Sequence, residues 1–163
     1  MNQTDLWDRL AHTLRSECEA YQSLLQLLDE EGLCLQRLSL QSLHEVTSRK
    51  AQLLTLIEQL DGVWMDQLQG LARSARKEEL LPWLGRSIHP RAKEAQAALN
   101  ALISLGHKTK ACGKRNGNLL SHAQYVVHEA LQVIYAGLGA QPVYGQSGQI
   151  SFPSVTGSMS LQG

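Results

Sequence analysis

The sequence predicts an all-α protein: an elongated antiparallel bundle of three long helices plus a short connecting helix, with a flexible C-terminal tail. Residues that favour helices, chiefly Leu, Gln, Glu, Arg and Ala, dominate the chain as far as Glu129. Aromatic residues make up only 5% of the sequence and Phe152 is the sole Phe, so leucine must supply the core. The 34 residues after Glu129 carry no Lys, Arg, Asp or Glu, and their Gly-rich end predicts a tail.

The first long helix is predicted over residues 4–36, with Asn2 or Thr4 as its N-cap. Its apolar residues recur at heptad spacing, interrupted by Glu17 and Glu31. The stripe consists of Trp7, Leu10, Leu14, Tyr21, Leu24, Leu28, Leu35 and Leu38. A stripe of this length predicts packing against neighbouring helices along the whole element.

The second long helix is predicted over residues 40–73. Ser39 and Ser42 both suit an N-cap, and Ser42 with Glu45 forms a capping-box pattern. Two helices of ~33 residues would each be ~50 Å long, which predicts side-by-side packing in an elongated bundle. The stripe consists of Leu43, Val46, Leu53, Leu54, Ile57, Leu60, Trp64, Leu68 and Leu71.

A break follows the second helix, because residues 76–86 contain Pro82 and Gly85. One or two short helical turns are expected there. Pro90 suits the first turn of a third helix that runs to about residue 138. Its apolar residues before and after a polar interval are Ala95, Leu99, Leu102, Ile103, Gly106, Leu120, Ala123, Val127, Ala130, Leu131, Ile134 and Leu138.

The polar interval, residues 108–118, leaves two topologies open. Asn116-Gly117 is a turn signal, and a turn there would divide the segment and give a four-helix bundle. The alternative is one helix of about 48 residues that tolerates Gly113 and Gly117 at roughly 1 kcal/mol each. Local rules favour the break.

The formal net charge is zero, but the charges are unevenly distributed. Residues 1–85 hold 13 acidic and 8 basic side chains, whereas residues 86–115 hold 7 basic side chains against Glu94 alone. One interpretation is a basic patch for an acidic partner or nucleic acid. The favoured interpretation is a basic third helix that lies beside two acidic ones in the bundle.

Several classes of protein are excluded or disfavoured. No apolar stretch approaches the ~20 residues of a membrane span, and the N-terminus lacks the basic and apolar segments of a signal peptide. The three cysteines have no metal-ligand spacing, and no His pair, phosphate-binding Gly loop or nucleophile elbow occurs. We therefore expect a cytoplasmic protein without cofactor or metal that is not an enzyme.

The layout resembles the FlgN family, the flagellar type III export chaperones for the hook–filament junction proteins. The residues that carry the resemblance are Asn116, Gly117, Leu119 and Leu120 in the third helix, Tyr144, Gly145 and Gly148 in the tail, and Lys50 in the second helix. The resemblance covers nearly the whole chain in layout. It implies that Asn116-Gly117 lies inside a continuous helix, against the local rule.

The resemblance also implies a function. Such chaperones bind the C-terminal amphipathic segment of hook-associated proteins of the FlgK and FlgL type, prevent premature assembly, and deliver them to the export apparatus. A partner helix needs an apolar stripe that the chaperone does not bury by itself. The predicted client groove is Leu119, Leu120, Ala123, Val127, Ala130, Leu131, Ile134 and Tyr135. The alternative is that this stripe belongs to the core.

The sequence divides into a helical domain over residues 1–138 and a flexible uncharged tail over residues 139–163. Within the tail, the resemblance suggests that Tyr144 docks a component of the export gate or its ATPase. The alternative is a frayed terminus whose few apolar residues are incidental.

Two other functions were weighed. A helical nucleic-acid- or protein-binding adaptor would use the basic patch from Lys108 to Arg115, but that patch has no interleaved aromatic residues, and we expect no nucleic acid partner. A four-helix-bundle metalloenzyme would need Glu-x-x-His pairs, and the sequence has none.

Overall fold

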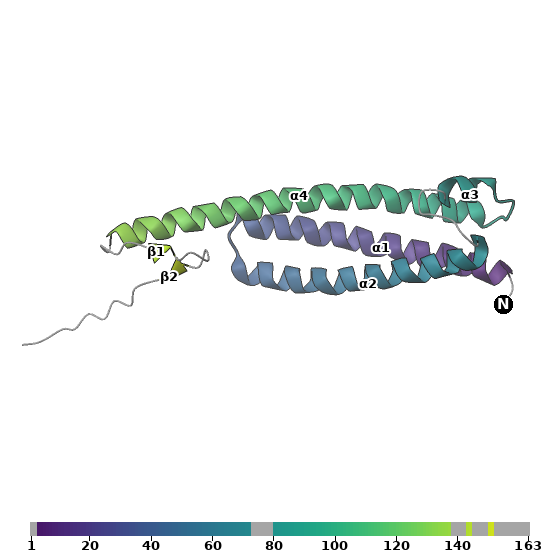
Figure 1. Cartoon of the computed structure of the whole chain (residues 1–163), viewed down its shortest axis with the longest axis horizontal. Coiled ribbons are helices and arrows are strands. Elements are labelled where there is room, and N and C mark those ends of the chain that lie inside the picture. The colour runs from purple at the N-terminus through teal and green to yellow at the C-terminus, as the bar shows by residue number, and fades with distance from the viewer. Residues whose placement is uncertain (1–2, 73–79, 138–142, 145–149, 152–163) are drawn as a thin grey trace, which may run out of the picture. The chain divides into compact units, whose positions relative to one another are not determined.

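The computed structural model describes residues 3–72, 80–137, 143–144 and 150–151. The elements are α1 (Gln3–Gln36), α2 (Leu40–Ala72), α3 (Leu80–Arg86), α4 (Ala92–Gly137), β1 (Val143–Tyr144) and β2 (Ile150–Ser151) (Figure 1). The chain divides into two compact units, residues 1–120 and 121–163, which are described separately. Apart from the two short strands, the described part of the chain is helical, which confirms the predicted all-α class and the four helices.

The predicted helix bounds agree with the structure to within a few residues. The sequence left open whether the third long helix is continuous or broken. In the structure, α4 is one continuous helix from Ala92 to Gly137. The turn that local rules predict at Asn116-Gly117 is therefore wrong. The continuous helix has tertiary support, because the side chain of Asn116 is buried and hydrogen-bonded to α1.

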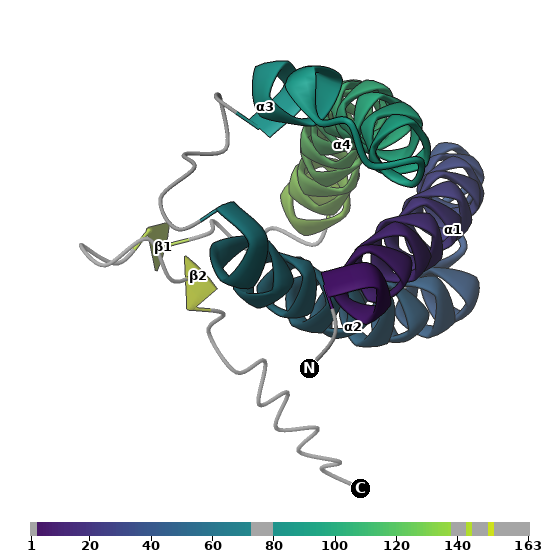
Figure 2. The ribbon, with the colours of Figure 1, turned by 90° about the vertical axis from the view of Figure 1, so that its right-hand side faces the viewer.

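Within residues 1–120, contacts between helices define their directions. Hydrogen bonds join Arg49 to Glu30 and Gln67 to Thr13. The residue numbers in these pairs rise along α2 and fall along α1, so the two helices are antiparallel. The ion pairs Arg15–Glu94 and Asp29–Arg115 join residues whose numbers rise together along α1 and α4, so α4 runs parallel to α1. Figure 2 shows these helices nearly end-on.

The core of this unit lies in two clusters of buried side chains. The larger cluster joins all four helices and contains Trp7, Leu10, Leu14, Trp64, Leu68, Leu84, Ala92, Ala95, Leu99 and Leu102. The smaller cluster contains Ala20, Leu24, Leu28 and Ile57, with Cys112 of α4 packed against it. The short helix α3 thus contributes Leu84 to the main core, which holds α3 against the other three helices.

The turn between α1 and α2 carries an unusual backbone conformation. Leu38 has φ 53°, in the left-handed region that favours glycine. The amides of Leu38 and Ser39 bond back to the carbonyls of Leu35 and Cys34, which is the Schellman arrangement of a helix end. Since α2 begins at Leu40, Ser39 occupies the cap position. The predicted Ser42 capping box is wrong, because Ser42 lies inside the helix.

We predict that Leu38→Gly stabilises the protein by about 0.5–1 kcal/mol. A left-handed L-residue costs about 1–2 kcal/mol, and glycine removes this cost while adding roughly 0.5–1 kcal/mol of unfolded-state entropy. Half of the Leu38 side chain is already exposed, so little burial is lost. Urea denaturation followed by circular dichroism measures the change. Leu38→Ala is the control, because it keeps the strained conformation and should show no gain.

In the second unit, β1 pairs with β2 in antiparallel register, with Val143 opposite Ser151 and Tyr144 opposite Ile150. The sequence did not predict this pairing. Most of the predicted flexible tail, residues 139–163, lies outside the described residues. The domain boundary at residue 138 remains a prediction.

Candidate partner-binding site

The candidate site is built on one face of α4. Within residues 1–120 this face packs on the rest of the bundle, and its buried residues are Ala92, Ala95, Leu99, Leu102 and Asn116. Residue Asn116 is the last buried position of the helix. Leu120, Val127 and Ile134 lie 4, 11 and 18 positions after Asn116. At 3.6 residues per turn, these spacings place them on the same face of the helix as Asn116.

The last five turns of α4 expose apolar side chains. None of residues 121–137 is buried, and the exposed fraction is 49% for Val127, 55% for Ile134 and 72% for Val133. The exposed large apolar residues from Leu120 onward are Leu120, Tyr125, Val126, Val127, Leu131, Val133 and Ile134. Soluble proteins seldom leave this many neighbouring apolar side chains exposed without a partner.

The structure gathers the eight predicted client-site residues on one side of α4. At ~100° per residue they span roughly 160° of the helix circumference. Of these residues, Leu120, Val127, Ala130, Leu131 and Ile134 are exposed, whereas Leu119, Ala123 and Tyr135 are half-buried. The interpretation of this stripe as core is therefore wrong for its exposed large residues, Leu120, Val127, Leu131 and Ile134. We call Leu120, Ala123, Val127, Ala130, Leu131 and Ile134 the α4 stripe.

A layer of three polar side chains, which the sequence patterns did not predict, lies just before the α4 stripe along α4. Asn116 is only 3% exposed and donates hydrogen bonds from Nδ2 to the carbonyl of Leu28 at 2.6 Å and to Glu31 Oε2 at 2.9 Å. Glu31 is 8% exposed, and its other oxygen accepts a hydrogen bond from Lys50 Nζ. We call Lys50, Glu31 and Asn116 the polar layer. The available signal was the pair of interruptions in the apolar stripes, Glu31 in the first helix and Asn116 in the third.

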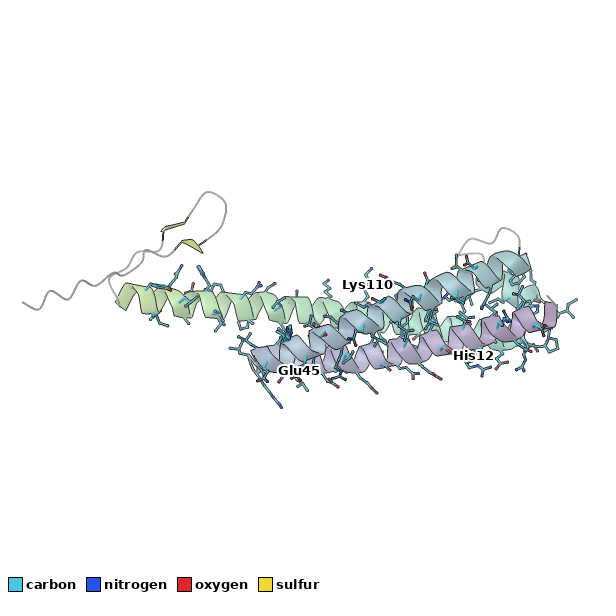
Figure 3. All side chains as sticks on the ribbon, turned by 90° about the horizontal axis from the view of Figure 1, so that it is seen from below. His12, Glu45 and Lys110 are labelled. Carbon is cyan, nitrogen blue, oxygen red and sulfur yellow. The ribbon has the colours of Figure 1, made fainter. Side chains whose placement is uncertain are left out.

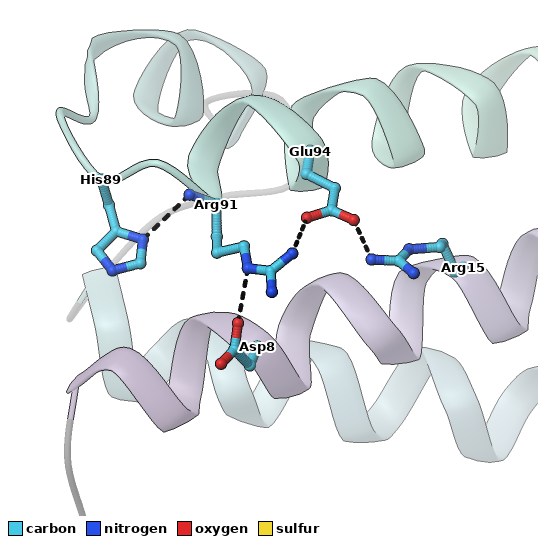
Figure 4. A network of polar contacts seen from close by, with 5 residues as sticks. All are labelled: Asp8, Arg15, His89, Arg91 and Glu94. Carbon is cyan, nitrogen blue, oxygen red and sulfur yellow. Dashed lines mark hydrogen bonds and ion pairs between the residues drawn. The ribbon is translucent and has the colours of Figure 1, made fainter.

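The basic charges of α4 and of Arg91, which directly precedes it, are partly neutralised inside the same unit. Arg91 forms ion pairs with Asp8 at 2.8 Å and with Glu94 at 2.7 Å, and Glu94 also pairs with Arg15 (Figure 4). Near the other end, Arg115 pairs with Asp29 at 2.9 Å. The predicted pairing of a basic third helix with acidic neighbours is confirmed for these two arginines. Lys110, in contrast, lies on the exposed surface of α4 (Figure 3).

We predict that Glu94→Gln flattens the pH dependence of stability in the acid range. The hydrogen bond from Arg91 holds the pKa of Glu94 below its ordinary value, although partial burial opposes the shift. A lowered folded-state pKa stabilises the fold above the ordinary pKa of Glu, and this stabilisation disappears as the pH falls through the lowered pKa. Urea denaturation of both proteins between pH 7 and pH 3 should give curves that converge at low pH. Curves that stay parallel would contradict the assignment.

The described residues contain no cluster of three or more potential metal ligands. Among the same residues, no helix is both long enough and apolar enough to cross a membrane.

Residues 1–151 match the family model described as FlgN protein. The chain belongs to the FlgN family. No curated protein and no solved structure matches the chain. The FlgN match spans all four helices, β1 and β2, so the resemblance noted from the sequence is confirmed as family membership. FlgN proteins are flagellar export chaperones, a role that requires a surface for another protein.

Proposed function

We propose that this FlgN protein is a chaperone that binds the C-terminal amphipathic segment of flagellar hook-associated proteins of the FlgK and FlgL type. Binding keeps these clients from assembling prematurely, and the complex is delivered to the type III export apparatus. The work is done in the cytoplasm by binding alone, without enzymatic chemistry. In this proposal the helices pack as an antiparallel bundle within residues 1–120, and the last turns of α4 bind the client.

The observation that supports the proposal most strongly is the α4 stripe. Its six residues span roughly 100° of the helix, the width of the apolar face by which an amphipathic helix packs on a partner. Ala123 and Ala130 are small and would let a client helix approach closely, while Val127, Leu131 and Ile134 supply apolar contact area. A client segment that is itself an amphipathic helix would cover the stripe and bury its own apolar face in the same step.

The residues next to the α4 stripe extend the apolar surface. Val126 and Val133 lie seven positions apart, which places them on a common side of the helix, and both are exposed. Leu119 and Tyr135 would border the client, as predicted from the sequence. In the second unit, we propose that Tyr144 of β1 docks the export gate or ATPase components.

A second function, an adaptor that uses the basic patch from Lys108 to Arg115, has less support. Arg115 is engaged with Asp29 and hydrogen-bonds Asn116, so the patch loses its arginine to contacts within the bundle. A partner bound through the remaining lysines would bind with strong salt dependence, whereas apolar contact on the α4 stripe predicts weak salt dependence.

Isothermal titration calorimetry tests the proposal. The full chain is titrated with a peptide that corresponds to the C-terminal segment of a hook-associated protein, at several temperatures and two salt concentrations. Binding with a negative heat-capacity change is expected, because apolar surface leaves water. Affinity should change little with salt. Failure to bind any such segment would contradict the client assignment, and a steep loss of affinity with salt would favour the adaptor.

A further inference from the structure

The two buried members of the polar layer, Asn116 and Glu31, have hydrogen-bond partners for both Nδ2 hydrogens and for both carboxylate oxygens. Both Nδ2 hydrogens of Asn116 have acceptors on α1, and its Oδ1 accepts a hydrogen bond from Arg115 Nε at 3.3 Å. Glu31 uses one oxygen for Asn116 and the other for Lys50. The layer therefore connects α2, α1 and α4 at one level of the bundle.

The backbone of α1 is adapted to this layer. A Cβ atom at Gly32 would lie 3.0 Å from Asn116 Oδ1 and 3.3 Å from an Arg115 nitrogen. Glycine at this position, next to Glu31, lets α4 approach α1 closely enough for Asn116 to reach the Leu28 carbonyl. The close approach and the hydrogen bonds thus belong to one arrangement.

Stability alone does not explain a layer of this kind. Moving a carboxylate, an ammonium group and an amide out of water is costly, and apolar side chains in their place are often as stable or more stable. Such groups do provide directional contacts, because their hydrogen bonds form only when donor and acceptor are correctly placed. A buried asparagine in a helical bundle restricts the alignment of its helices, because every other alignment leaves it unsatisfied.

The remaining contacts define the axial position of α4 less sharply. Apolar contacts are non-directional, and the hydrogen bond that joins these helices nearer their N-termini, from the Cys18 thiol to the Ala98 carbonyl at 3.4 Å, has a weak sulfur donor. The exposed ion pairs to Asp8 and Asp29 involve long side chains that can follow a shift. The stacking of Trp7 involves Trp83 and His89, which precede α4.

We propose that the polar layer is a register lock: it selects one axial position of α4 along α1, at the cost of desolvating its own groups. A slide of α4 by one helical turn, ~5.4 Å, would break every hydrogen bond of Asn116 to α1. Asn116 and Glu31 are thus positioning residues for the helix that carries the α4 stripe. The lock involves only residues 1–120 and holds whether or not the proposed client binds.

Double electron–electron resonance measures this register directly. Spin labels are placed at the exposed positions Arg9 of α1 and Ala111 of α4, in the full chain with its three cysteines replaced by alanine. These two sites lie at levels about 25 Å apart along the helix axes, so an axial slide of α4 changes the distance between them. The parent layer should give one narrow distance peak. Replacing the layer with leucine (Glu31→Leu, Lys50→Leu and Asn116→Leu together) should add a second peak or shift the peak by roughly 5 Å, while the urea midpoint does not fall.

Two further variants keep the test decisive. Asn116→Ala cannot clash with Gly32, so it should broaden the distance distribution even if the leucine layer is too large to fold. The matched control is Thr13→Val with Gln67→Leu, which removes a different polar contact, one that joins only α1 and α2, and should leave the peak unchanged. An unchanged narrow peak in a folded leucine-layer or Asn116→Ala variant would overturn the proposal. So would equal broadening in the control.

Discussion

Asn116→Asp is expected to lower the free energy of unfolding by about 3–5 kcal/mol at pH 7, the usual cost of breaking a buried charged network. The substitution preserves shape but exchanges the Nδ2 donor for an anionic oxygen. That oxygen would face the carbonyl of Leu28, now 2.6 Å from Nδ2, and the carboxylate of Glu31, now 2.9 Å away. Two hydrogen bonds would become two repulsive contacts in a buried environment.

Urea denaturation at pH 7 and pH 4 measures this effect. Part of the loss should be recovered at pH 4, because a protonated Asp can again donate one hydrogen bond, and burial beside Glu31 favours the protonated form. Asn118→Asp is the matched control, since Asn118 is exposed on the same helix only two residues away. A loss below 1 kcal/mol for Asn116→Asp, or an equal loss for Asn118→Asp, would contradict the buried layer.

Trp7→Ala is expected to destabilise the protein by about 3–5 kcal/mol, the range for truncating a large buried aromatic side chain. Trp7 is buried, and its ring stacks on Trp83 of α3 at 5.4 Å and on His89 at 5.1 Å between centroids. Both interplanar angles are below 10°. The Trp7 ring of α1 therefore stacks on α3 and on the segment that precedes α4. Removing it opens a cavity in the main core cluster.

The measurement is urea denaturation followed by far-ultraviolet circular dichroism, with Trp7→Phe as the conservative variant. Phenylalanine retains an aromatic ring in the stack and should recover much of the loss. Comparable destabilisation by both substitutions would mean that a smaller aromatic ring at position 7 does not replace the contacts of the indole ring. A loss below 1 kcal/mol for Trp7→Ala would contradict the placement of Trp7 in the core.

Periodicity alone predicted the helices well, for a local reason. Apolar residues such as Leu10, Leu14, Ile57 and Trp64 recur at helical spacing, and the structure buries all four. The local turn rule failed at Asn116-Gly117, where the continuous helix implied by the family resemblance is confirmed. The turn preference of this dipeptide is a local property, whereas the contact that supports a continuous helix is with Leu28, 88 positions away in the sequence.

The polar layer could not be predicted for a similar reason. In the sequence, Glu31 only interrupts an apolar stripe, because residue spacing does not show which side chain will bind it. Its hydrogen-bond donor is Lys50, on the other side of the α1–α2 turn. The α4 stripe was predicted residue by residue as a partner surface, but the sequence left the alternative of a buried core stripe open. The spacing of Val127, Leu131 and Ile134 would be the same in a buried helix, so only the structure distinguishes surface from core.

The most direct test of the client-binding claim compares two lysine substitutions on α4 by calorimetry with a hook-associated C-terminal segment. Leu131→Lys places a charge in the α4 stripe, where a bound helix would have to desolvate it. Ala136→Lys is the matched control: Ala136 is exposed and lies nine residues, about two and a half turns, after Val127, on the opposite side of the helix. We predict that Leu131→Lys weakens binding at least tenfold, about 1.4 kcal/mol, while Ala136→Lys binds as the parent does and both keep the parent urea midpoint. Equal affinities for the two variants would contradict the α4 stripe as the client site.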